Sequence, residues 1–269
     1  MNTRLTWQPK TTPVELHAML RELQQAYPIV EGAAGGVRIS FVRSRRAGVC
    51  AVRRTGTTAQ ITFTAPAQAA RAIGALLGGL RSVSERTPFT SLGIMLDCSR
   101  NAVIKVDHMK TWLRRLALLG YNMAMLYTED TYELADEPYF GYQRGRYTAD
   151  ELRELDACAA RLGIELIPCI QTLGHLEKIL RYPAYRTVRD TANVLMVGEP
   201  QTYALIEKML VMWKSTCRTR RIHIGMDEAE ELGRGRYLTL NGYRPGSQLM
   251  SAHLARVAAL CRQHGLKPM

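Results

Sequence analysis

The sequence predicts an α/β protein, in which a small α/β domain (residues 1–88) precedes the first four βα units of a (β/α)8 barrel (residues 89–269). Three observations support this fold. Strand-like and helical segments alternate strictly after Ser91, glycine follows three of the helices, and polar side chains follow four successive strands. Parallel strands joined by helices have this pattern, and they gather functional groups at the carboxyl ends of the strands.

The composition is that of a globular protein with a hydrophobic core, since 46% of the 269 residues are hydrophobic and 22% are charged. The formal net charge of +12 would suit an anionic partner, but the basic residues are scattered. The densest basic clusters, in residues 43–54 and 218–221, lack a nucleic-acid-binding motif and interleaved aromatic residues. We therefore expect a solvated basic surface and no nucleic-acid partner.

The six cysteines are dispersed without a C-x-x-C pair, which is typical of reduced core residues. The first twenty residues contain no long apolar run, and no segment approaches the roughly 18 apolar residues of a membrane span. These features predict a reducing, cytoplasmic location and no membrane partner.

The first 88 residues should form two helices around a group of strands. Thr12 to Glu15 have the spacing of a capping box with proline at the first helical position, which predicts a helix over 13–27. Alternating β-formers predict strands at 37–42, 49–53 and 59–64, and Pro66 begins a second helix that ends near residue 80. The glycines at 32, 35 and 36 fit no phosphate-binding motif, and we interpret them as a turn.

The later segments alternate between strand and helix. We expect strands at 93–96, 121–127, 164–170 and 221–226, and helices at 103–119, 148–162, 199–217 and 247–264. Gly120, Gly163 and Gly265 each follow a helix, where a left-handed cap favours glycine. An eightfold barrel takes about 250 residues, so the sequence predicts a barrel truncated after its fourth unit. An open doubly wound sheet of four or five strands is the alternative.

Four successive strands of this region are followed by polar residues at their carboxyl ends. Each group alone has a structural explanation, such as a helix cap, a turn or a packed histidine, but together they occupy the position where barrels collect catalytic groups. On a regular strand Asp227 and Glu228 would point to opposite faces, so joint action requires a bend, which Gly225 permits. The groups are Asp97 with Arg100, Glu129 with Asp130, Gln171 with His175, and Asp227 with Glu228.

These residues resemble the motifs of the β-N-acetylhexosaminidases of glycoside hydrolase family 20. The six residues from His223 to Glu228 resemble the family's H-x-G-x-D-E motif. Residues 96–100, 128–130 and 167–175 are similar to its motifs at the first, second and third strands, and residues 127–132 and 139–142 are most similar to bacterial exo-N-acetylglucosaminidases related to hexosaminidase D. The first 88 residues resemble the small domain that precedes the barrel in this family.

The resemblance implies a retaining exo-β-N-acetylhexosaminidase that removes terminal β-linked N-acetylglucosamine or N-acetylgalactosamine from a glycan. In such enzymes the 2-acetamido oxygen of the substrate attacks the anomeric carbon, so the protein needs one acid and one positioning group. It implies that Glu228 protonates the leaving oxygen and that Asp227 orients the acetamide. The other implied site residues are Arg100, Asp130 and His175 at the substrate, with His223 and Glu129 in support.

The resemblance also implies how the acid would hold its proton. A glutamate near its reference pKa of about 4.3 would be mostly ionised at neutral pH, so burial or a negative neighbour must raise the pKa of Glu228. Asp130, linked to His175, is the expected neighbour. No cofactor and no metal are implied.

The chain departs from the family pattern at four positions. Cys169 and Gln171 stand where third-strand acids are usual, Leu173 replaces proline, and Met226 replaces a second glycine. The tyrosine and tryptophans that line the family's sugar pocket come from later strands, beyond Met269. We therefore expect the amino-terminal part of a hexosaminidase, with open barrel edges that favour self-association.

Two other functions stay open from the sequence. A metal-dependent hydrolase could use His175, His223, Asp227 and Glu228, although their spacing matches no short metal-binding motif. A noncatalytic sugar-binding module, or an inactive fragment, is consistent with half a site. Neither alternative changes the predicted fold.

Overall fold

The structure, a computed structural model, describes residues 3–32, 35–100 and 102–269. The chain divides into two compact units. Unit 1 comprises Met1–Ile94, Lys105–Ala124 and Ala157–Glu165, and unit 2 comprises Met95–Ile104, Met125–Asp156 and Leu166–Met269. Unit 1 thus joins the predicted small domain to helical segments that we assigned to the barrel. The domain boundary after residue 88 stays a prediction.

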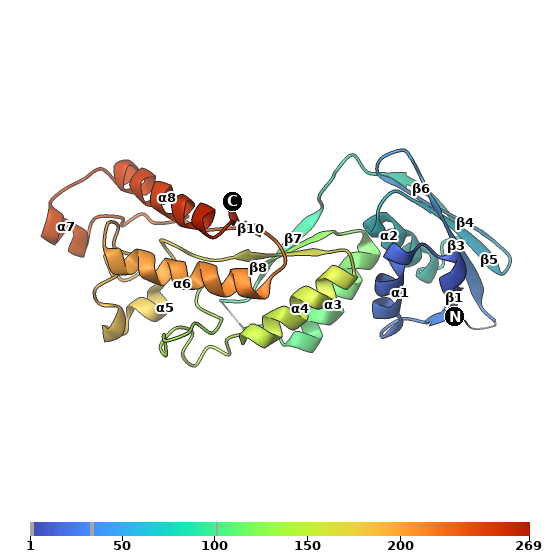
Figure 1. The fold of residues 1–269 in the computed structure, drawn as a ribbon, viewed down its shortest axis with the longest axis horizontal. Helices are drawn as coiled ribbons and strands as arrows, with labels where there is room; N and C mark the ends of the chain where they lie inside the picture. Colours follow the sequence, from blue (N-terminus) through green and yellow to red (C-terminus); the bar gives the residue numbers. More distant parts are fainter. Residues whose placement is uncertain (1–2, 33–34, 101) are drawn as a thin grey trace. The chain divides into compact units, whose positions relative to one another are not determined.

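Unit 1 contains a six-stranded sheet in the order β2-β1-β3-β5-β4-β6. The strands β4 and β5 pair antiparallel, as do β4 and β6, whereas the other neighbours are parallel. Figure 1 shows the helices α1 and α2 on the same side of this sheet. The elements are β1 (Leu5–Trp7), α1 (His17–Gln24), β2 (Ile29–Glu31), β3 (Val37–Arg43), β4 (Val49–Thr55), β5 (Thr58–Phe63), α2 (Pro66–Leu77) and β6 (Ser82–Arg86).

The predictions for this sheet are confirmed at three strands and at α2. The sequence missed β1 and β2, which have only three residues each, and β6, which is mostly exposed and lacks hydrophobic alternation. The first helix begins later than predicted. Pro13 has a ψ of 130°, an extended value, so two short 3-10 helices (Pro9–Thr11 and Val14–Leu16) precede α1. The predicted capping box does not form, and the Thr12 hydroxyl is buried without a hydrogen-bond partner among the described residues.

The barrel strands follow one another in chain order. The strands β7 (Gly93–Asp97), β8 (Met123–Tyr127) and β9 (Glu165–Cys169) form one sheet in that order. A parallel bridge between Cys169 and His223 extends it to β10 (Arg221–Ile222), which pairs parallel with β11 (Lys267–Pro268). This order lacks the reversal that a doubly wound sheet has at its switch point, so the barrel prediction is preferred over its alternative.

The four predicted helices lie where the sequence places them, with ends shifted by a few residues, and the short helices at Glu177–Leu180 and Arg236–Asn241 were not predicted. Gly120, Gly163 and Gly265 all have the predicted left-handed backbone, with φ of 89°, 74° and 68°. Thr148 caps its helix, since Glu151 donates its N–H to the threonine hydroxyl at 3.2 Å. The helices are α3 (Val106–Leu119), α4 (Ala149–Arg161), α5 (Glu177–Leu180), α6 (Pro200–Thr216), α7 (Arg236–Asn241) and α8 (Gly246–Gln263), with a 3-10 turn at Pro183–Tyr185. Among the described residues, no helix is both long and apolar enough to cross a membrane.

A buried charged cluster within unit 1 joins α1, α3 and the last turn of α4. Glu22 on α1 is 1% exposed and accepts hydrogen bonds from Arg114 on α3 at 2.6 Å and from Arg161 on α4 at 2.7 Å. Burial alone would raise the pKa of Glu22, but the bonds from the two arginines outweigh it, and the pKa lies below its usual value. The cluster therefore holds a carboxylate ionised inside the protein and attaches the small domain to α3 and α4.

Replacing Glu22 should destabilise the chain strongly. Glu22→Gln leaves Arg114, which is only 12% exposed, without its counter-charge, and breaking a buried pair in this way costs about 3–5 kcal/mol. Urea unfolding of the two proteins measures the loss. The matched control is Glu31→Gln, which breaks the exposed pair with Arg21 and should cost less than about 1 kcal/mol. Equal losses in both variants would contradict a special role for the buried cluster.

A buried histidine should make the stability depend on pH. His253 on α8 is fully buried, and its Nε2 lies 2.8 Å from the Thr172 carbonyl oxygen. Because a carbonyl can only accept, Nε2 carries the proton and Nδ1 accepts from the Tyr203 hydroxyl at 3.2 Å. Burial lowers the pKa of His253 to about 4.

An unfolded histidine takes up a proton near pH 6.5, whereas folded His253 does not until about pH 4. The contribution of His253 to the free energy of unfolding is therefore fully present above pH 6.5. It is lost as the pH drops toward 4, and the loss is up to about 3 kcal/mol. Chemical unfolding between pH 7.5 and 4.5 tests this. His253→Gln should flatten the pH dependence by most of that amount, and an unchanged slope would show that other groups are responsible.

Candidate active site

The end of β9 and the segment after β10 are joined by a ladder of hydrogen bonds. Ile170 donates its N–H to the His223 carbonyl, and His223 donates to the Pro168 carbonyl, both at 2.9 Å. The ladder continues beyond both strands, since Thr172 donates its N–H to the Gly225 carbonyl at 2.9 Å and its hydroxyl to the Ile224 carbonyl at 2.6 Å. It holds the residues before Asp227 against the loop that contains Gln171 and His175.

Gly225 permits this close approach. Its φ is 40°, and a Cβ at this position would lie 2.3 Å from the Ile170 carbonyl oxygen and 2.5 Å from Gln171 Oε1. The predicted strand over 221–226 is therefore too long, because β10 ends at Ile222 and the backbone turns at Gly225. Glu228 has a φ of 51°, which is unusual for a residue with a side chain. The expected bend before the two carboxylates is confirmed.

The two adjacent carboxylates share one histidine. His175 Nε2 lies 3.4 Å from Asp227 Oδ2 and 3.4 Å from Glu228 Oε2. The amide of Gln171 donates to Asp227 Oδ1 at 3.2 Å, so both oxygens of Asp227 face a polar group. Desolvation raises the pKa of Asp227, but the bond from Gln171 and the charge of His175 outweigh it and bring the pKa below its usual value. Asp227 is therefore ionised at neutral pH.

The environment of Glu228 differs from the sequence-based expectation. Its side chain is 74% exposed, so the described part of the chain does not bury it. The structure places His175 beside Asp227 and Glu228, and it places Asp130 beside Arg144. We expected Asp130, linked to His175, as the negative neighbour of Glu228, whereas in the structure His175 approaches both Asp227 and Glu228 and Asp130 faces Arg144.

Arg144 neutralises the two acids that follow β8. Its Nη2 lies 3.3 Å from Asp130 Oδ1 and 3.6 Å from Glu129 Oε2, and it donates to the Ser99 carbonyl after β7. Glu129 and Asp130 are only 4% and 2% exposed. Burial raises the pKa of both, Glu177 adds to that effect, and the charge of Arg144 opposes it. Sequence reasoning missed Arg144, because it lies in a long loop and belongs to no motif.

A chain of polar contacts connects the ends of β7, β8 and β9. Arg100 pairs with Asp97 at 3.0 Å, and its guanidinium carbon lies 4.9 Å from the centre of the Tyr127 ring. The Tyr127 hydroxyl accepts from the Gln171 amide at 3.0 Å, and Gln171 in turn donates to Asp227. Burial raises the pKa of Tyr127 to about 12, so its phenol keeps its proton. Sequence reasoning did not identify Tyr127 as a site residue, because an aromatic residue within a predicted strand fits the pattern of the core.

The predicted site residues thus fall into two neighbouring groups. Arg100, His175, Asp227 and Glu228 belong to the chain of contacts that includes Tyr127 and Gln171, and Glu129 and Asp130 lie with Arg144. His223 Nδ1 accepts the Gly225 N–H at 3.3 Å and so supports the turn before the acids. The described residues hold no group of three or more His, Cys, Asp or Glu side chains that could bind a metal ion.

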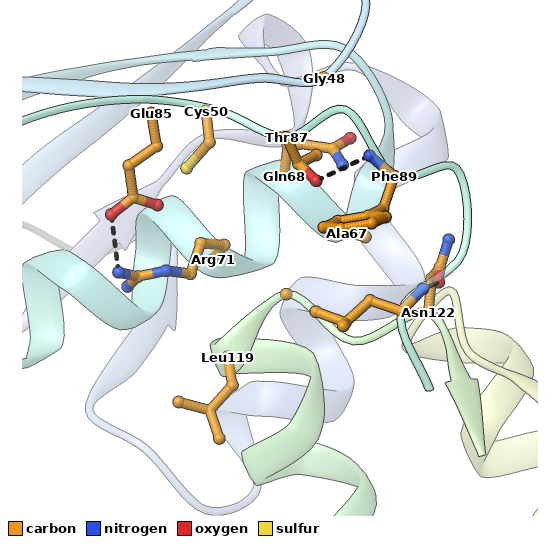
Figure 2. A pocket seen from close by; sticks show the side chains of 12 residues that line it. Gly48, Cys50, Ala67, Gln68, Arg71, Glu85, Thr87, Phe89, Leu119 and Asn122 are labelled. Atoms are coloured by element: carbon orange, nitrogen blue, oxygen red, sulfur yellow. Dashed lines mark hydrogen bonds and ion pairs between the residues drawn. The ribbon is translucent and has the colours of Figure 1, made fainter. Parts of the chain in front are cut away.

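A separate pocket lies within unit 1 and contains none of the predicted site residues (Figure 2). Its volume is about 160 Å³, and Phe89, Leu119 and Cys50 are among the residues that line it. Its charged groups already pair with each other, because Arg71 donates to Glu85 at 2.8 Å. We assign this pocket no chemistry.

Comparison with known proteins identifies the family. Strands in barrel order with polar groups at their carboxyl ends define an α/β-barrel protein, and residues 89–237 match the model of the catalytic domain of glycosyl hydrolase family 20. The chain belongs to glycosyl hydrolase family 20. It is 29% identical to human hexosaminidase D over 162 residues, which are 57% of this chain and 32% of that protein. It is 30% identical to a β-hexosaminidase of Vibrio furnissii over 115 residues, 38% of this chain and 18% of that protein.

Solved structures of the family have the same fold. The exo-β-N-acetylglucosaminidase of Vibrio harveyi, solved in complex with N-acetylglucosamine, matches with a TM-score of 0.78 at 20% identity, over 99% of this chain and 51% of that one. A mutant Streptomyces plicatus β-hexosaminidase in complex with its product matches with a TM-score of 0.76 at 17% identity, over 99% of this chain and 60% of that one. The likeness confirms the α/β fold with part of a barrel. The chain spans about half the length of the Vibrio harveyi structure and about a third of the human relative.

Removing the charge of Arg144 should change the protonation of its two partners. In Arg144→Gln, Asp130 and Glu129 lose the cation that favours their ionised forms, so their pKa values should rise further. Carboxyl ¹³C NMR titration of the two residues measures this directly. A carboxyl group whose pKa is higher in the folded state than in the unfolded state stabilises the fold only at low pH, where it is protonated. The variant should therefore lose stability relative to the parent as the pH rises from 4 to 7. The loss should reach about 3–5 kcal/mol.

Arg153→Gln is the control for this experiment. Arg153 is 50% exposed and pairs with Asp150, which is 93% exposed, so its loss should cost less than about 1 kcal/mol at any pH. Unchanged titration of Asp130 in Arg144→Gln would show that Arg144 does not control the buried acids.

Proposed function

We propose that this chain supplies the acidic residues of a retaining exo-β-N-acetylhexosaminidase, which removes terminal β-linked N-acetylglucosamine or N-acetylgalactosamine from a glycan. The observation that supports it best is the pair Asp227 and Glu228, each 3.4 Å from His175 Nε2 at the end of a barrel strand. Membership of the family and the solved relatives with N-acetylglucosamine bound are consistent with this reaction. Adjacent carboxylates suit substrate-assisted catalysis, in which the acetamide of the sugar is the nucleophile.

Asp227 would hold the acetamide. It is ionised, the Gln171 amide donates to one of its oxygens and His175 lies 3.4 Å from the other, so it can accept the acetamide N–H in a defined direction. As the acetamide oxygen bonds to the anomeric carbon, positive charge develops on the new ring. A fixed negative charge beside that ring stabilises the transition state more than the ground state.

Glu228 would donate a proton to the leaving oxygen. Its backbone at φ 51° and its exposed side chain place its carboxyl toward solvent, where a glycosidic oxygen can reach it. A bound glycan would exclude water from this carboxyl, and desolvation favours the protonated form of an acid. His175 would orient the group, since its Nε2 lies between the two acids.

The remaining predicted residues would bind or support. Arg100 is 54% exposed and is held by Asp97, so its free donors can bind sugar hydroxyls. Asp130 and Glu129 are buried with Arg144, where they support the ends of the strands, and His223 supports the turn at Gly225. A reducing, cytoplasmic location is part of the proposal, because all six cysteines are buried and free.

A second candidate function is sugar binding without hydrolysis. The carboxylates of Asp227 and Glu228 are 57% and 74% exposed. A general acid acts best in a site that excludes water. An open site of this kind would bind the terminal sugar and release it unchanged.

The test compares the purified chain with Glu228→Gln on an aryl N-acetyl-β-D-glucosaminide, with N-acetylglucosamine binding followed by NMR in parallel. Loss of a positioned acid should lower turnover about 10²–10⁴-fold while binding persists. Glu230→Gln, which changes an exposed acid two residues away, should leave both unchanged. Binding without turnover in the parent chain would select the second candidate. The absence of both would reject the two functions together.

A further inference from the structure

Three tyrosines meet on the surface of unit 2. The rings of Tyr139 and Tyr182 stack at a centroid distance of 5.0 Å and an interplanar angle of 25°. Tyr142 meets both rings edge-on, at 6.0 Å from Tyr139 and 6.2 Å from Tyr182. Tyr139 and Tyr142 are 42% and 45% exposed. We call these three residues the tyrosine cluster.

Other aromatic residues than the tyrosine cluster pack the loop after β8 against the protein. In the same loop Tyr132 and Phe140 are fully buried, with their rings 4.9 Å apart, and Tyr132 lies 5.2 Å from Trp213 on α6. These inward aromatic residues already attach the loop to the helix behind it. Neighbouring Tyr139 points outward, and exposed aromatic groups of this kind are typical of binding surfaces.

The cluster lies at the same end of the barrel strands as the candidate active site. Tyr139 and Tyr142 lie between β8 and α4, and Tyr182 lies between β9 and α6, so both loops follow barrel strands at their carboxyl ends. Gly141, between the first two tyrosines, has a φ of 64°, and a Cβ there would lie 2.3 Å from the carbonyl oxygen of Asp130. The loop that contains Tyr139 and Tyr142 is therefore packed closely against the backbone of Asp130.

The chemistry of the cluster fits a sugar. A pyranose ring has an apolar face of C–H groups and an edge of hydroxyls, and tyrosine likewise combines an apolar ring face with a hydroxyl that donates and accepts. The Arg181 guanidinium carbon lies 4.9 Å from the centre of the Tyr182 ring and adds hydrogen-bond donors at its rim. Rigid tyrosine rings also lose little side-chain entropy when they bind.

We propose that the tyrosine cluster binds the sugar units of the substrate glycan that lie beyond its terminal N-acetylhexosamine. The inference rests on the proposed function, since the terminal sugar would occupy the site at Asp227 and Glu228. The occupant is the continuing chain of the same glycan. Its sugars cross the carboxyl ends of β8 and β9 and stack on Tyr139 and Tyr182.

The test is calorimetric titration of the full chain with N-acetylglucosamine and with its β-1,4-linked tetramer. Two added stacking contacts should make the tetramer bind about tenfold more tightly than the monosaccharide. Replacing Tyr139 and Tyr182 together by alanine should remove this difference and leave the affinity for the monosaccharide unchanged. The pair of phenylalanine variants keeps the rings and should retain most of it.

Tyr243 provides a matched control, because it is 83% exposed and lies outside the cluster. Tyr243→Ala should keep the full gain of the tetramer. Equal affinity of the parent for monosaccharide and tetramer, or a gain that survives the double alanine change, would overturn the proposal. If the parent forms a concentration-dependent dimer that the double alanine variant at Tyr139 and Tyr182 loses, without a change in sugar affinity, the occupant is a second copy and the proposal is overturned.

Failure of the proposed function gives a different result. If the monosaccharide does not bind but the tetramer binds and depends on Tyr139 and Tyr182, the site at Asp227 is wrong and the cluster is supported as a glycan-binding surface. If neither sugar binds, both proposals are overturned.

Discussion

The hydrogen-bond ladder between residues 168–172 and 223–225 determines the geometry of the site. It aligns the end of β9 with the chain after β10, and it continues past both strands through the N–H and the hydroxyl of Thr172. Only glycine fits at Gly225, where the ladder ends and the backbone turns. Asp227 and Glu228 follow at once, so the turn directs both acids toward His175. His253 on α8 bonds to the carbonyl of Thr172 and so holds the other side of the same segment.

The carboxylates discussed above have two kinds of environment. Two groups of buried carboxylates face arginines: Arg114 and Arg161 surround Glu22, and Arg144 faces Glu129 and Asp130. These acids support the fold, because moving them requires breaking several bonds at once. Where carboxylates face solvent, as in Asp227 and Glu228, the polar side chains beside them are the amide of Gln171 and the ring of His175. Such acids are free to contact a ligand, which is the property the proposed reaction needs.

The tyrosine cluster extends this division of roles from the site to the surface around it. The loop after β8 uses Tyr132 and Phe140 to pack against α6, Arg144 to neutralise the buried acids, and Tyr139 and Tyr142 to face solvent. One loop thus supports the strand ends and presents an aromatic surface beside them. The loop after β9 likewise has two roles: His175 approaches the two acids, and Tyr182 stacks on Tyr139 in the tyrosine cluster.

The sequence alone determined the order of the barrel elements, because hydrophobic periodicity and the glycines at helix ends are local signals, and Gly120, Gly163 and Gly265 all have the left-handed backbone. It also identified most of the acids and cations at the strand ends, since position after a strand can be read without contacts. It did not find Arg144 or Tyr127, and it paired His175 with Asp130 where the structure places Asp227 and Glu228 beside it. Those partners were decided by tertiary structure, because loops far apart in the chain meet only when strand register and backbone turns bring them together.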